Sequence, residues 1–174
     1  MPVANLTNHI TSPSLTTSPH TDGRFVPLGL DELRGLVIES WSGESSSAKD
    51  WSRLNTAKGQ SAATACVVRE HLGGEIEWCD VRVGNEIFRH YSNLVKGQRI
   101  DLTAVQYPEN AVIPDERQTE VPKTPEATET FNSMWDFLMA DPAHKNQYVI
   151  LSATVSDCLA RRQPQLPALP DDGY

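Results

Sequence analysis

The segment Gly59–Leu72, with the sequence GQSAATACVVREHL, determines how we interpret the fold of this chain. Its first turns are almost entirely apolar after Ser61, so a helix over about Gln60–Leu72 would be buried on nearly all sides. The pair Gly73-Gly74 ends this helix, because glycine accepts the left-handed backbone that closes many helices. We therefore expect a central, buried helix with Ser61 in its first turn.

Three strands are predicted after this helix. They cover about Glu75–Val83, Glu86–Leu94 and Gln98–Thr103, and two short turns, Gly84-Asn85 and Lys96-Gly97, join them. Sequential strands with turns this short pair in an antiparallel sheet. The chain is therefore expected to have an α+β fold, with the central helix packed on an antiparallel sheet.

The second hairpin brings a histidine and a carboxylate together. If Lys96-Gly97 is a two-residue turn, then His90, Ser92, Asp101 and Thr103 all point to one face, because side chains alternate along a strand. His90 and Asp101 become diagonal neighbours at roughly 7–8 Å between backbones, within reach of a side-chain hydrogen bond. A carboxylate in that place could fix the imidazole tautomer and stabilise its charged form.

Other segments define the rest of the domain. Apolar residues spaced three or four apart predict helices over Leu30–Ser40 and Thr130–Ala140, whereas Tyr148–Cys158 fits either a strand or a terminal helix. Residues 1–24 are rich in Ser, Thr, Pro and Asn and are expected to be a disordered arm. We expect one domain over residues 25–162 and an extended tail over residues 163–174.

Composition excludes several classes of function. The chain has 174 residues and a net charge of -8, which argues against nucleic acid as a partner. No apolar run approaches the roughly 20 residues that cross a bilayer, and the N-terminus lacks a signal peptide, so the cytoplasm is the expected location. Three cysteines without a CxxC pair disfavour a disulfide framework and a zinc site, and we expect neither metal nor cofactor.

Ser61, His90 and Asp101 occur in the order nucleophile, base and orienter. The start of a helix favours negative charge, and the amides there, with Gln60 and Ala62, could form an oxyanion hole. Each residue also has a structural explanation. Ser61 could be a helix cap, His90 a buried strand residue, and Asp101 part of a turn.

Several motifs resemble those of the bacterial YunG-like proteins. That family carries GQC-A-TA, a GGE step, HYWN and DLT, and an upstream SWS-x-E element. The matching segments here are Gly59–Ala65, Leu72–Ile76, His90–Asn93, Ile100–Thr103 and Ser40–Glu44. The resemblance covers about residues 28–110 and implies a papain-like or transglutaminase-like fold with a Cys-His-Asp site.

The resemblance gives each site residue a role. It places Ser61 at the nucleophile position, His90 as the base and Asp101 as the orienter, and Asn93 matches an asparagine that shapes the pocket. Ser92 replaces the tryptophan of HYWN, which opens room for a different substrate. Trp51, in the loop before the central helix, is expected to tuck that loop onto the core and to help bind substrate.

The expected function is a hydrolase or acyltransferase that acts on an amide or thioester bond of a small-molecule or peptide-like substrate. Ser61 stands where the family has cysteine. We interpret it as a substitution that inactivates the enzyme, with a natural serine as the alternative. The rival hypothesis is a non-catalytic module that holds a ligand or a protein. A third reading assigns the function to the terminal arms. The oligomeric state is left open.

Overall fold

The computed structural model describes residues 28–123 and 131–162. These residues form four α-helices and a three-stranded antiparallel sheet in the strand order β1-β2-β3, so the fold is α+β as predicted. The strands are β1 (Glu75–Val83), β2 (Glu86–Val95) and β3 (Gln98–Ile100); the helices are α1 (Leu30–Ser40), α2 (Ser61–Leu72), α3 (Met134–Ala140) and α4 (Pro142–Arg162), and η1 (Ala104–Gln106) is a 3-10 turn.

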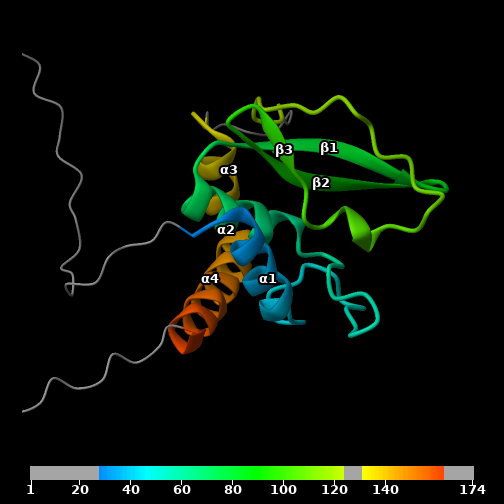
Figure 1. The fold of residues 1–174 in the computed structure, drawn as a ribbon. Coiled ribbons are helices and arrows are strands. Elements are labelled where there is room, and N and C mark those ends of the chain that lie inside the picture. The colour runs from blue at the N-terminus through cyan, green and yellow to red at the C-terminus, as the bar shows by residue number, and fades with distance from the viewer. Residues whose placement is uncertain (1–27, 124–130, 163–174) are drawn as a thin grey trace, which may run out of the picture.

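Helix α2 is the centre of the domain. It contacts β1 and β2 on one side and α1 and α4 on the other, so it lies between the sheet and the helices α1 and α4 (Figure 1). Every residue from Ser61 to Val68 is buried, as the apolar first turns predict. Gly73 then ends the helix with a positive φ of 72°, and its N–H donates to the carbonyl of Arg69.

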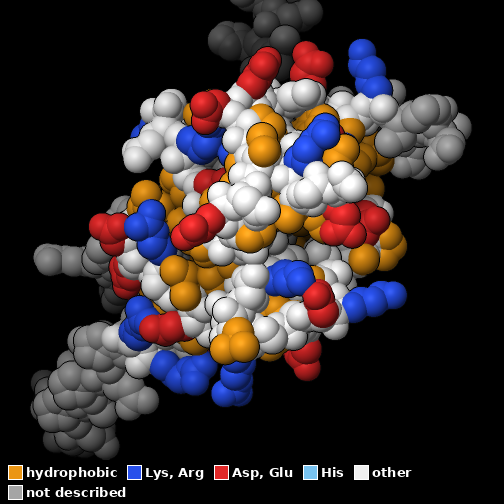
Figure 2. Space-filling model, turned by 90° about the vertical axis from the view of Figure 1, so that its right-hand side faces the viewer, with side chains coloured by type: hydrophobic (Ala, Val, Ile, Leu, Met, Phe, Trp, Pro, Cys, Tyr) orange, Lys and Arg blue, Asp and Glu red, His pale blue; other side chains and the backbone are white. Residues whose placement is uncertain are grey.

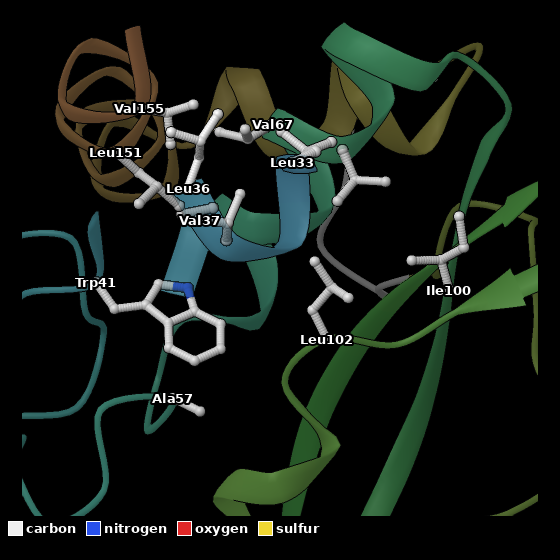
Figure 3. Packing of buried hydrophobic residues seen from close by; sticks show 12 residues of the cluster. Leu33, Leu36, Val37, Trp41, Ala57, Val67, Ile100, Leu102, Leu151 and Val155 are labelled. Atoms are coloured by element: carbon white, nitrogen blue, oxygen red, sulfur yellow. The ribbon is translucent and has the colours of Figure 1, made fainter. Parts of the chain in front are cut away.

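Two hydrophobic clusters pack against opposite sides of α2. The larger one joins α1, α2 and α4, and Trp41, Ala57, Ile100 and Leu102 close its lower edge (Figure 3). The smaller one lies between α2, the sheet and α3, and includes Cys66, Trp78 and Tyr91. Together the two clusters fix α2, and therefore position 61, relative to the hairpins.

The sheet register matches the prediction, but its last strand is shorter. Val95 pairs with Gln98 across the Lys96-Gly97 turn, and pairing continues only to Asn93 and Ile100. The expected strand to Thr103 is therefore wrong beyond Ile100. Asp101 instead lies in the loop that leads into η1, because the chain turns away from β2 there.

The described residues also settle two predictions about the helices. Tyr148–Cys158, which fitted either a strand or a helix, lies within the 21-residue helix α4. Helix α3 starts at Met134 because Ser133 caps it, its side chain accepting a hydrogen bond from the Asp136 amide. The predicted start at Thr130 lies outside the described residues, and Phe131–Ser133 are not helical.

The predicted arm (1–24) and tail (163–174) also lie outside the described residues. Within the described residues, no helix is long and apolar enough to span a bilayer.

Candidate active site

Ser61 is the first residue of α2, and it does not cap the helix. The residue at the cap position is Gln60, whose side chain makes no capping hydrogen bond. Helix geometry leaves the first amides of α2 without partners inside the helix. Ser61 is 8% exposed and lines a cavity of about 880 Å³. The structural alternative of a serine cap therefore does not account for this residue.

The turn before Ser61 is held by the SWS-x-E segment and by Ser45, which follows it. The Gln60 side chain donates to the Ser42 carbonyl at 2.7 Å and accepts from the Ser45 hydroxyl at 2.9 Å. The Trp41 indole N–H donates to the Thr64 hydroxyl at 3.0 Å, which ties the same segment to the next turn of α2. Gln60 is fully buried and both ends of its amide are occupied, so its side chain is engaged in structure rather than free to donate to an oxyanion.

His90 and Asp101 are brought into direct contact. His90 Nε2 lies 2.8 Å from Asp101 Oδ2, and the histidine is fully buried. An ionised carboxylate can only accept a hydrogen bond, so Nε2 carries the proton and Nδ1 is the free acceptor of a neutral ring. The predicted pairing of these two residues is thus present, although Asp101 reaches His90 from a loop rather than from a strand.

Two side chains face the free nitrogen: that of Gln106, the last residue of η1, and that of Tyr107, which follows it. Gln106 Nε2 and the Tyr107 hydroxyl each lie 3.4 Å from His90 Nδ1, and both groups can donate. The Tyr107 ring also meets the imidazole edge-on, with 5.3 Å between ring centres. Both residues line the same cavity as Ser61. Burial raises the pKa of the Tyr107 hydroxyl, so this group remains a hydrogen-bond donor at neutral pH.

Ser61 and His90 are connected indirectly. The Gln106 side chain accepts from the Gly59 amide at 3.1 Å while its nitrogen faces His90 Nδ1. Among the described residues, no hydrogen bond joins the Ser61 hydroxyl to His90. Asn93 donates to the Ala65 carbonyl of α2 at 2.9 Å, so its face of β2 is turned to α2, and His90, three positions away, lies on the other face.

Arg117 completes the surroundings of Asp101. Its side chain is 6% exposed, and Nη2 lies 3.6 Å from Asp101 Oδ2. Nη1 contacts the Cys79 sulfur at 2.8 Å and also the Pro114 carbonyl. Cys79 is directly opposite His90 on β1, and burial raises the pKa of its thiol. A guanidinium thus lies beside the carboxylate that contacts the imidazole.

The remaining predicted site residues have structural contacts. The Ser92 hydroxyl donates to Glu77 at 3.0 Å, and Asn93 ties β2 to α2. Ala62 packs in the smaller hydrophobic cluster. The Trp51 indole donates to the Thr56 carbonyl at 2.9 Å within its own loop, and Trp51 is not among the residues that line the cavity.

Sequence reasoning missed Gln106, Tyr107 and Arg117. The first two follow the Asp-Leu-Thr motif in a segment without periodicity, and no local pattern indicates where their side chains point. Arg117 follows η1 in a segment outside the helices and strands, where no periodic pattern predicts the position of a side chain. In residues 28–123 and 131–162, no group of three His, Cys, Asp or Glu side chains could hold a metal ion.

Comparison with known proteins gives one match. A family model described as YunG protein matches residues 29–160, which include every helix and strand except the end of α4. No curated protein and no solved structure matches this chain.

Proposed function

The chain belongs to the YunG protein family, and we propose that its cavity is the active site of a hydrolase or acyltransferase for an amide or thioester bond. The observation that carries the proposal is the buried His90–Asp101 pair. Its free nitrogen faces Gln106 and Tyr107, which share the cavity with Ser61. A papain-like or transglutaminase-like arrangement is part of this proposal. It is supported by a central helix that presents position 61 and by Gln106, which links the turn before that helix to His90. His90 itself does not line the cavity and lies on the face of β2 turned away from α2.

The proposed reaction needs a nucleophile at position 61. The thiol of a cysteine at this position, or the hydroxyl of Ser61 in this chain, attacks the acyl carbon. His90 Nδ1 takes the proton of that nucleophile. The imidazolium then returns that proton to the departing amine or thiol. Water or an amine completes the cycle by attacking the acyl-enzyme. The unpaired amides at the start of α2 offer donors to the oxyanion, and Tyr107 provides another at the cavity wall.

The η1 segment has to move for this chemistry. Gln106 and Tyr107 occupy the direction of the Nδ1 lone pair, and their 3.4 Å contacts are long for hydrogen bonds. Long contacts of this kind are weak, so a substrate can replace them. Val105 in the same turn is 76% exposed, so a displacement of η1 is resisted mainly by the hydrogen bonds of Gln106 with Gly59, Thr103 and Asn55.

Alkylation of an introduced thiol tests the proposal. Ser61→Cys and Ser47→Cys both place a thiol on the cavity wall, but only the first lies at the start of α2. We expect iodoacetamide at pH 7 to modify position 61 at least about tenfold faster than position 47, because the helix start and the base stabilise a thiolate. Peptide mass separates these adducts from any on Cys66, Cys79 or Cys158. His90→Ala should remove the difference; equal rates in all variants contradict the proposal.

A non-catalytic binding module is the second candidate. Serine is a weaker nucleophile than cysteine, and the base nitrogen is already faced by two donors. Both features fit a cavity that holds a ligand without reacting with it. Slow alkylation of Ser61→Cys, together with a serine codon in the natural gene, would favour this module over the enzyme.

A further inference from the structure

The walls of the cavity carry large apolar side chains that are exposed to solvent. Leu54 is 100% exposed, Val105 is 76% exposed and Phe88 is 42% exposed, and all three line the cavity that contains Ser61. They come from three separate segments, namely the loop before α2, the η1 turn and β2. Apolar side chains scattered singly on a surface need no explanation, but a group around one cavity marks a binding site.

The basic side chains around the cavity are already paired with acidic ones. Lys58 is paired with Asp50 at 2.5 Å, and Arg89 is paired with Asp80 at 2.7 Å. Asp50 and Glu86 are the acidic residues of the lining, and Lys58 and Arg89 are its basic ones. Because each base already has an acidic partner, no basic side chain of the lining is free to bind an anionic ligand. Glu86, which pairs with no base among the described residues, would repel an anion. Figure 2 shows the face with residues 47–61, 83–89 and 105–108, where hydrophobic side chains lie among charges of both signs.

From these observations we infer that the acyl portion of the substrate is an uncharged aliphatic or aromatic group that lies against Leu54, Phe88 and Val105. This inference rests on the proposed function, since it places the scissile carbonyl at Ser61. A cavity of about 880 Å³ is within the usual size range for small-molecule sites. Contact with these three side chains removes apolar surface from water on both partners, which supplies the binding free energy.

Binding of N-phenyl-1-naphthylamine, an uncharged fluorophore, tests the inference on the unchanged chain. We expect saturable binding that octanamide displaces. Val105→Asp and Leu54→Asp should each weaken it at least about fivefold, which corresponds to about 1 kcal/mol. Val149→Asp is the matched control, because Val149 is 51% exposed on α4 and does not line the cavity. Its effect should stay within about twofold.

The same fluorophore separates this inference from the proposed function. In Ser61→Cys, we expect bound fluorophore to slow alkylation at position 61 by iodoacetamide. No saturable binding, equal losses in Val105→Asp and Val149→Asp, or binding without protection of position 61 would each overturn the inference. Specific binding to a Ser61→Cys variant whose thiol reacts no faster than that of Ser47→Cys would instead overturn the proposed enzyme and leave an apolar-ligand site.

Discussion

The side-chain oxygen of Gln106 accepts a hydrogen bond from the backbone N–H of Gly59 at 3.1 Å. This contact joins the η1 segment to the turn that delivers Ser61, across 47 positions of sequence. The nitrogen of the same side chain donates to the Thr103 carbonyl and faces His90 Nδ1. One amide group therefore sets the spacing between the start of α2 and the base, and the turn it holds should be sensitive to substitution.

Gly59→Ala should destabilise the protein more than Gly84→Ala. Both glycines have positive φ, +70° and +60°, so the backbone strain on alanine is similar. A Cβ at Gly59 would lie 2.5 Å from the Ala48 amide nitrogen, whereas none of the described residues comes within 4 Å of one at Gly84. We expect an additional loss of about 1–3 kcal/mol in the free energy of unfolding, measured in urea. Equal losses would show that the loop containing Ala48 shifts to accommodate the added methyl group at little cost in stability.

Asp101→Asn should remove most of the roughly tenfold advantage in alkylation rate that the Ser61→Cys thiol has over the Ser47→Cys thiol. Asparagine keeps the shape of the side chain but removes the charge that fixes the proton on His90 Nε2 and stabilises the imidazolium. The rates are measured with iodoacetamide at pH 7, and Asp80→Asn is the control because Asp80 pairs with Arg89 on the surface. An unchanged rate in Asp101→Asn would mean that the carboxylate does not act through the histidine.

Arg117→Gln should cost about 3–5 kcal/mol of stability, since it leaves Asp101 without the nearby guanidinium in a buried setting. Arg162→Gln breaks the ion pair between Arg162 and Glu39, whose side chains are 42% and 58% exposed, respectively. Loss of this surface pair should cost at most about 1 kcal/mol of stability. Urea unfolding of the two variants measures the difference. If Arg117→Gln is as mild as Arg162→Gln, water reaches Asp101.

Stability should fall at alkaline pH partly because of Cys66. Burial raises the pKa of this thiol from 9.0 to about 12. Above pH 9 the unfolded chain therefore releases a proton that the folded protein keeps, so the free energy of unfolding decreases as pH rises toward 12. Between pH 9 and pH 10 this contribution is about 1 kcal/mol.

Cys66→Ala should flatten this alkaline decline, and Cys158→Ala, at a partly buried position, serves as the control. Urea unfolding of both variants and of the unchanged chain at pH 8, 9 and 10 gives the slopes. A decline that is equally steep in Cys66→Ala would assign it to other groups, such as Tyr107 and Tyr91, whose pKa values burial also raises.

Local patterns were enough to predict the elements that surround α2. The apolar first turns indicated a buried helix, and the Lys96-Gly97 turn fixed the register that puts Asp101 near His90. Where β3 ends could not be predicted, because Asp101, Leu102 and Thr103 fit either a strand or a loop. The choice depends on tertiary contacts: Leu102 packs into the larger cluster and η1 turns back toward Gly59. Gln106, Tyr107 and Arg117 were missed for the same reason, since their positions depend on long-range contacts.

The separation of His90 and Asp101 by only 11 positions has a consequence for how the molecule folds. A pair joined by one tight turn can meet as soon as that hairpin closes, whereas the contact between Gln106 and Gly59 must close a loop of 47 positions. We therefore expect the base and its carboxylate to assemble early in refolding and position 61 to join them late. An intermediate in which His90 is in place but position 61 is not would have no hydrolase or acyltransferase activity.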